Sequence, residues 1–163
     1  MRHTLCLLLA LAFLIPASLK ADEAALRLSL SFSTGKAGIA PLLSIENISK
    51  SELSIMSPDS VNAIAFAVID ARTGNFVMPE LLAKVEAVSH EPIALKPGDT
   101  LKCSSRDFTA ISSSEGMLFP FHTGTALMAY RLEKGVNYRI TAIYRPSGFE
   151  KNGVASEETS FSY

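Results

Sequence analysis

Cysteine is scarce in this sequence, and that scarcity limits how the chain is held together. Only Cys6 and Cys103 occur, and Cys6 lies in an amino-terminal segment that we expect to be removed. Cys103 then has no partner, so an intrachain disulfide is excluded even in an oxidising compartment. Leu101, Cys103 and Ser105 share one face of an expected strand, with Leu101 inward. We therefore expect Cys103 to be a buried thiol, with a link between chains as the alternative.

The sequence also lacks an excess of charge of one sign. Without residues 1–21 it has 13 basic and 16 acidic residues, a net charge of −3, and no basic run. Nucleic-acid binding depends on clustered Lys and Arg side chains that neutralise phosphates. We therefore expect no nucleic-acid partner.

Motifs that carry chemistry are missing as well. After residue 21 the only histidines are His90 and His122, whereas a metal site needs several ligands at closing spacings. There is no H-E-x-x-H, no G-x-S-x-G and no glycine-rich phosphate loop. Cys103 with either histidine would form a dyad, but a strand cysteine without an activating neighbour argues against one. The sequence predicts no catalytic residue, no metal, no cofactor and no enzyme activity.

Only one stretch is long and apolar. A charged start, MRH, precedes LCLLLALAFLI at 5–15, and Pro16 and small residues follow. The run is shorter than the roughly 20 residues that span a bilayer, and the pattern is typical of a secretory signal peptide. We predict a signal peptide over 1–21, with cleavage after Ala17 or an uncleaved anchor as alternatives. The mature 22–163 chain would be one domain, periplasmic or secreted, without membrane insertion.

What the chain does contain is alternation with a period of two, which indicates half-buried strands. In LRLSLSFS at 26–33 the leucines and Phe32 share one side and the serines the other; in NAIAFAVID at 62–70, Ile64, Phe66 and Val68 point inward. The segment 80–90 fits two turns of helix or a loop equally well. Further strands are expected at 41–49, 52–55, 75–78, 92–95, 100–108, 138–144 and 154–163, and the type of 123–132 stays open. The sequence predicts an all-β fold, an immunoglobulin-like antiparallel β-sandwich of seven to eight strands.

The stretch LEKGVNYRITAIY at 132–144 has the spacing of a tyrosine corner. Such a corner needs an apolar anchor, a residue free to adopt unusual backbone angles, and a ring whose hydroxyl bonds the backbone upstream. Leu132, Gly135 and Tyr138 supply these at the right offsets, and glycine suits the middle position. The alternating run that follows strengthens the prediction, which concerns architecture and not activity.

Four pieces of the sequence carry a resemblance to known proteins. They are Asn47 in the second strand, Asp70 and Gly74 of a D-x-x-x-G hairpin, Leu95, Pro97 and Gly98 of an L-x-P-G turn, and the corner. With these pieces the chain looks like the amino-terminal non-catalytic β-sandwich of secreted deuterolysin-like metallopeptidases, and its layout is similar to bacterial immunoglobulin-like proteinase inhibitors. The resemblance implies a β-sandwich and, weakly, an inhibitor role. We expect no peptidase activity to carry over, because H-E-x-x-H is absent and the sequence leaves no room for a peptidase domain after Tyr163.

Asn47-Ile48-Ser49 is also a glycosylation sequon. Because Asn47 lies at the end of an expected strand, we favour a structural role at the turn.

One apolar stretch is a candidate binding loop. GMLFPFHTG at 116–124 follows a serine-rich segment. It either closes the open end of the sandwich or docks a partner, since monomers rarely leave such clusters exposed. The candidate partner-binding residues are Met117, Leu118, Phe119, Phe121 and His122.

The favoured hypothesis is an exported, non-catalytic protein-interaction module with an unknown protein partner, inhibitor-like or an assembly accessory. Binding would use loops or a sheet edge. A subunit of a surface structure and an enzyme of unrecognised type are the alternatives.

Overall fold

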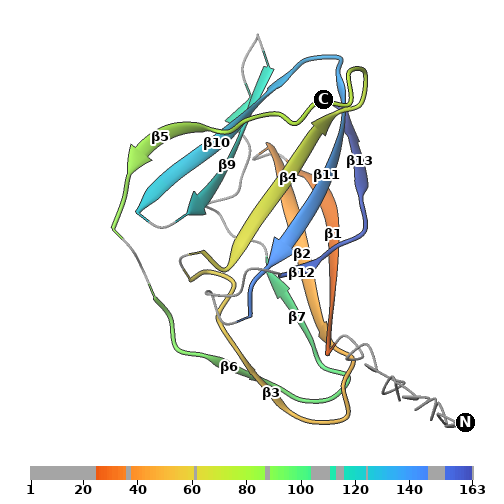
Figure 1. The fold of residues 1–163 in the computed structure, drawn as a ribbon, viewed down its shortest axis with the longest axis vertical. Coiled ribbons are helices and arrows are strands. Elements are labelled where there is room, and N and C mark those ends of the chain that lie inside the picture. Colours follow the sequence, from red (N-terminus) through yellow and green to blue (C-terminus); the bar gives the residue numbers. More distant parts are fainter. Residues whose placement is uncertain are drawn as a thin grey trace, which may run out of the picture.

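The fold is all-β (Figure 1). The structure is a computed structural model. It describes residues 25–35, 38–60, 62–86, 89–103, 111–112, 116–123, 125–146 and 153–162. These ranges contain strands paired in antiparallel sheets and no helix. They therefore include no helix that is long and apolar enough to cross a membrane. The predicted signal peptide, residues 1–21, lies outside the described residues.

The first sheet contains β1 (Leu26–Gly35), β2 (Gly38–Asn47) and β7 (Thr100–Cys103) in the order β1-β2-β7. β1 and β2 pair along their whole lengths, from Leu26 opposite Asn47 to Gly35 opposite Gly38. Successive side chains of a strand point to opposite faces. The predicted inward faces are confirmed, because Leu26, Leu28, Leu30, Leu43 and Ile45 are buried and Phe32 packs partly against the core.

The second sheet is built around β11 (Asn137–Tyr144). β4 (Ile64–Asp70) pairs with one side of β11, and β12 (Val154–Ala155) and β13 (Thr159–Ser162) pair with the other. Ile64, Phe66 and Val68 are buried, as the alternation in 62–70 predicts.

The third sheet has the order β5-β10-β9-β8. Its strands are β5 (Glu80–Lys84), β10 (Ala126–Glu133), β9 (Gly116–Thr123) and β8 (Ile111–Ser112). β5 lies at the outer edge of this sheet, at the far left in Figure 1. A separate pair, β3 (Leu53–Ile55) and β6 (Ile93–Leu95), runs along the opposite end of the molecule.

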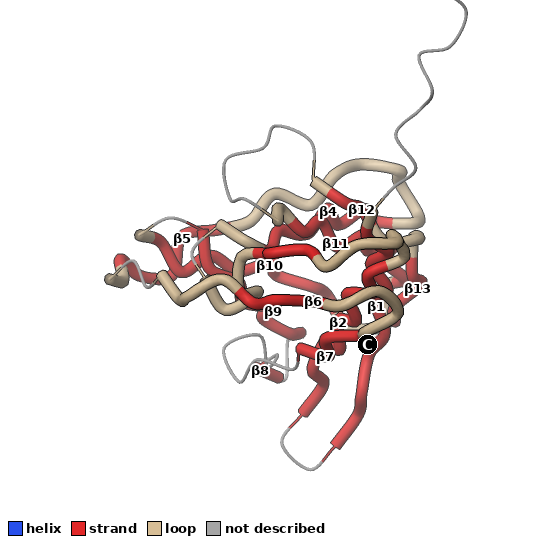
Figure 2. The backbone as a smooth tube through the Cα atoms, turned by 90° about the horizontal axis from the view of Figure 1, so that it is seen from below, coloured by secondary structure: helices blue, strands red, loops and turns tan. Residues whose placement is uncertain are grey.

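One hydrophobic cluster joins the three larger sheets. It includes Ile45 from the first, Tyr144 from the second and Phe119 from the third. Figure 2 shows β4 and β11 in one layer and β2 and β7 in another. The antiparallel layers are therefore compatible with a β-sandwich, with the third sheet closing one side of the shared core.

The sequence-based expectations for 80–90 need correction. Over Glu80–Lys84 the chain is neither helix nor loop but strand β5, paired with β10. A helix there would need its apolar stripe buried against another element. Leu81 and Leu82 are instead exposed, so edge pairing of the backbone decides the local structure.

The strand count also differs from the expected seven to eight. The described ranges contain thirteen strands, of which β3, β6, β8 and β12 have two or three residues each. The expected strand at 154–163 is divided into β12 and β13, because residues 156–158 between them are not part of the ladder with β11. The expected strand at 75–78 is reduced to one bridge, between Phe76 and Ile69. Of the expected strand at 100–108, residues 104–108 lie outside the described ranges.

Candidate protein-interaction surfaces

Residues 116–123 do not form an exposed loop. They form β9, in which Met117, Phe119 and Phe121 point into the core and are buried. Phe119 packs edge-on against Phe66 with ring centroids 4.8 Å apart. The interpretation of this stretch as a docking loop is therefore corrected for these three residues, because the period of the strand turns them inward. The alternative, that the stretch closes the core, fits the observed burial.

Two residues of the former candidate loop lie on the opposite face of β9. Leu118 and His122 are half-buried, and their backbone partners on β10 are Arg131 and Leu127. They lie on β9, which β10 separates from the edge strand β5, and being half-buried they do not form a protruding apolar cluster.

The corner residues meet in one turn. The backbone N–H of Glu133 donates to the hydroxyl oxygen of Tyr138, with an N···O distance of 2.8 Å. Leu132 and Tyr138 are buried, and Gly135 between them has a φ of 76°, which residues with a Cβ rarely adopt. Burial raises the pKa of the Tyr138 hydroxyl, so at neutral pH it remains protonated and available to the backbone.

The hairpin turn that follows β4 is linked to this corner by ion pairs. Asp70 accepts from the backbone N–H of Arg72 and pairs with the Arg72 guanidinium at 2.9 Å. The hydrogen bond from Arg72 lowers the pKa of the Asp70 carboxyl. Arg72 also reaches Glu133 at 3.4 Å. The D-x-x-x-G hairpin and the tyrosine turn therefore share one exposed ion-pair network at the end of β4 and β11.

Asn47 is a structural residue at the end of β2. Its side chain is buried, and Nδ2 donates to the carbonyl oxygens of Leu95 (2.7 Å) and Ser51 (2.8 Å). Its Oδ1 accepts from the N–H and the hydroxyl of Ser49. A nitrogen that donates both protons inside the fold leaves no room for a glycan in the folded chain.

Cys103 is a half-buried free thiol at the end of β7. Burial, with a smaller contribution from the charge of Asp59, raises the pKa of this thiol to about 11. The nucleophilic form of cysteine is the thiolate, so at neutral pH Cys103 is protonated and weakly reactive. Within the described ranges no three His, Cys, Asp or Glu side chains come close enough to hold a metal ion.

The surface feature that the sequence reasoning missed is the stretch FVMPELL, residues 76–82, which we name the 76–82 segment. Four of the five large apolar side chains exposed among the described residues lie in it. Their exposed fractions are 67% for Phe76, 79% for Met78, 56% for Leu81 and 38% for Leu82. The sequence offered one indication of it, since a run of seven residues with a single charge follows directly on a turn.

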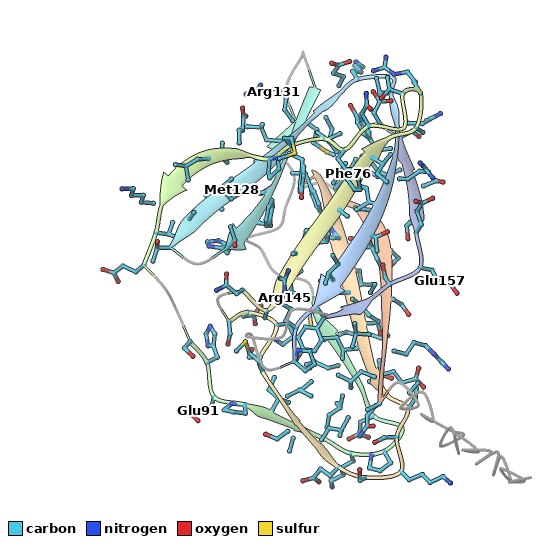
Figure 3. The ribbon with its side chains drawn as sticks, in the orientation of Figure 1. Phe76, Glu91, Met128, Arg131, Arg145 and Glu157 are labelled. Carbon is cyan, nitrogen blue, oxygen red and sulfur yellow. The ribbon has the colours of Figure 1, made fainter. Side chains whose placement is uncertain are left out.

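The path of the backbone explains why these side chains are exposed. The N–H of Val77 donates to the carbonyl of Val68 on β4 at 2.8 Å, and Val77 packs partly against the core. Because side chains alternate along an extended chain, Phe76 and Met78 then point away from the core. Figure 3 shows Phe76 near the end of β4, where the chain crosses toward β5.

The end of the segment is fixed by a polar pair. Glu80 on β5 accepts from Arg131 on β10 at 2.7 Å. Leu81 lies opposite Met128, and Met128 is itself half-buried and packed against the core. The apolar surface therefore continues from the core, through Met128, to the exposed Leu81 at the sheet edge.

Comparison with known proteins adds no family assignment. A scan against protein-family models gave no match, and a search of curated proteins found no similar sequence.

Proposed function

We propose that this chain is an exported, non-catalytic protein-interaction module that binds another protein through the 76–82 segment. The observation that carries the proposal is the concentration of exposed apolar side chains in seven consecutive residues. Soluble monomers rarely leave such a cluster uncovered without an interaction that uses it.

The apolar area that the segment exposes is large enough to support a binding role. A phenylalanine side chain offers roughly 150–250 Å² of surface, and two-thirds of Phe76 is exposed. At about 25 cal/mol per Å², covering Phe76 alone would contribute about 3 kcal/mol to the free energy of binding, before the costs of association. Met78 is still more exposed, so the segment holds two adjacent anchors of the kind that dominate protein interfaces.

The surroundings fit the same role. Apolar anchors in interfaces are usually bordered by polar groups. The Arg72 network precedes the segment in the chain, and Glu80 within the segment pairs with Arg131 of β10. The partner surface is therefore apolar at its centre and polar at its rim. The absence of catalysis is part of the proposal, and the protonated state of Cys103 supports it.

We also propose that the layered sheets form an immunoglobulin-like β-sandwich. The Tyr138–Glu133 hydrogen bond at a turn with Gly135 supports this, because the same device closes sandwich corners in that class. The resemblance to the non-catalytic domain of deuterolysin-like metallopeptidases and to immunoglobulin-like inhibitors rests on the sequence pieces alone.

The test is a pull-down with the mature 22–163 chain from the compartment that receives it. The variant Phe76→Ser/Met78→Ser removes the apolar anchors, whereas Phe76→Leu/Met78→Leu keeps them apolar at the same positions. We expect the serine variant to lose a partner that both the parent chain and the leucine variant retain, with unchanged thermal stability for all three. Retention of the same partner by the serine variant would exclude the segment as the binding surface.

A further inference from the structure

The methionine side chains of this protein differ widely in exposure, and exposure decides where a peroxide can reach a thioether sulfur. The sequence has five methionines, of which Met1 lies in the predicted signal peptide. Met117 is 2% exposed, and Met56 and Met128 are half-buried and packed against the core. Met78 in the 76–82 segment is instead 79% exposed, so solvent reaches its sulfur freely.

The backbone on both sides of Met78 holds its side chain away from the core. Val77 donates its N–H to the carbonyl of Val68 at 2.8 Å and packs partly against the core. Pro79 on the other side is also half-buried, and a proline restricts the residue before it to extended conformations. Because side chains alternate along an extended chain, neighbours that both face the protein leave Met78 pointing outward.

Two of the other methionines lie inside the third sheet, where neighbouring strands cover them. Met117 on β9 is opposite Leu132 of β10, and both side chains are buried. Met128 on β10, labelled in Figure 3, lies between Phe121 of β9 and Leu81 of β5. A peroxide molecule reaches a sulfur only where solvent does, so the fold shields both of these thioethers.

The thiol of Cys103 does not compete with Met78 for a peroxide at neutral pH. The thiolate is the form that attacks a peroxide, and burial raises the pKa of this thiol to about 11. A thioether carries no proton, so its sulfur lone pair is available at any physiological pH. The sulfur that is both accessible and reactive in the folded chain is therefore that of Met78.

We propose that Met78 is an oxidation site whose modification switches off binding by the 76–82 segment. The oxidant is a hydroperoxide of the class of hydrogen peroxide. A sulfur lone pair attacks one peroxide oxygen, the S–O bond forms and the O–O bond breaks, and the proton of the transferred oxygen passes to the released hydroxide, which leaves as water. The sulfur loses the electron pair that the peroxide gains, so no further reactant is needed.

Oxidation places a polar group within the most exposed apolar surface of the described residues. Met78 and Phe76 share the outward face, because they lie two residues apart in an extended chain. A sulfoxide oxygen that a partner's apolar face covers loses its hydrogen bonds to water, and conversion of methionine to sulfoxide disrupts interfaces of this kind. The loss of binding rests on the proposed function of the 76–82 segment, whereas the preferential oxidation of Met78 does not.

Peptide mass spectrometry of the mature chain after timed exposure to hydrogen peroxide tests the selection of the site. We expect Met78 to gain one oxygen atom at least about tenfold faster than Met117, with Met56 and Met128 between them. Unfolding the chain in urea before adding peroxide should bring the four rates close together, which controls for the intrinsic reactivity of each sulfur. Similar rates in the folded chain would overturn the proposal, since the fold would then select no site.

Retention on a phenyl-substituted resin tests the switch, with the immobilised phenyl group as the probe for an apolar partner surface. We expect peroxide to shorten the retention of the parent chain and to leave that of Met78→Leu unchanged. Met128→Leu is the matched control, which should respond to peroxide as the parent chain does. Unchanged retention of the parent chain after complete oxidation of Met78, or an equal loss in Met78→Leu, would overturn the switch.

The pull-down separates failure of this proposal from failure of the proposed function. A partner that the Phe76→Ser/Met78→Ser variant loses should bind the oxidised parent chain about tenfold more weakly than the untreated chain, and equal binding would overturn the switch. Retention of the partner by the serine variant would overturn the proposed function and the regulation of binding with it. The peptide map would still decide whether Met78 is the oxidation site.

Discussion

Replacing Phe119 and Phe76 one at a time with alanine tests which of the two side chains belongs to the core. Phe119 is 1% exposed, between the rings of Phe32, Phe66 and Tyr130, whereas Phe76 is 67% exposed. Phe119→Ala leaves a cavity, and buried Phe→Ala changes cost about 3–5 kcal/mol. Phe76→Ala removes an exposed side chain, and surface changes of this kind stay within about 0.5 kcal/mol. Because a whole domain is stable by only about 5–15 kcal/mol, the difference is large.

Equilibrium urea unfolding of the mature chain, followed by circular dichroism, measures both effects. With a slope of about 1–3 kcal/mol per molar urea, the midpoint should fall by about 2 M for Phe119→Ala and shift little for Phe76→Ala. Comparable losses at both positions, or a loss below about 1 kcal/mol at Phe119, would show that β9 does not contribute its face to the core as described.

Three further predictions concern the corner, the thiol and the amino terminus. Tyr138→Phe should lower the free energy of unfolding by about 1–3 kcal/mol, because the Glu133 N–H loses its acceptor. Gly135→Ala should lower the free energy of unfolding by about 1 kcal/mol through backbone strain alone, since no atom lies within 4 Å of the added methyl group. Denaturant unfolding measures both. Alkylation of native Cys103 should stay slow at pH 8 and accelerate only toward pH 11, where the thiolate forms. Because folding raises the pKa of this thiol, Cys103 contributes its full stabilisation below pH 9, near the pKa of the unfolded chain, and loses it as the pH rises toward 11. Amino-terminal sequencing of the exported protein should begin at Asp22, and a start at Met1 would contradict the predicted signal peptide.

Strands with strong contrast between their faces could be predicted from the sequence. In 26–33 the apolar residues alternate with serine and arginine, and in 138–144 with arginine and threonine. One face of such a strand must be buried, so the inward residues Leu28 and Ile140 follow from the period alone. The corner residues could also be predicted from the sequence, because few local structures other than a corner need a glycine shortly before a tyrosine that opens an alternating strand.

The stretch at 116–122 could not be read in the same way. Met117, Leu118, Phe119, Pro120 and Phe121 are all apolar, so neither parity stands out and the period of two is hidden. Only the pairing with β10 decides which side chains face the core. The sequence shows that the 76–82 segment is apolar, but it does not show that the segment is exposed, because exposure depends on whether another element covers that end of the sheet.

The edge strand β5 offers a partner its side chains and not its backbone. β5 is short, carries a register shift at Leu82 opposite β10, and ends in Lys84. Bulges, short length and lysine each discourage pairing with another strand. The backbone of β5 is therefore poorly suited to strand addition, and under the proposed function the exposed apolar side chains of the 76–82 segment would supply the contact. A partner for this surface would then need an apolar face, whereas a partner that extends a sheet would gain little from β5.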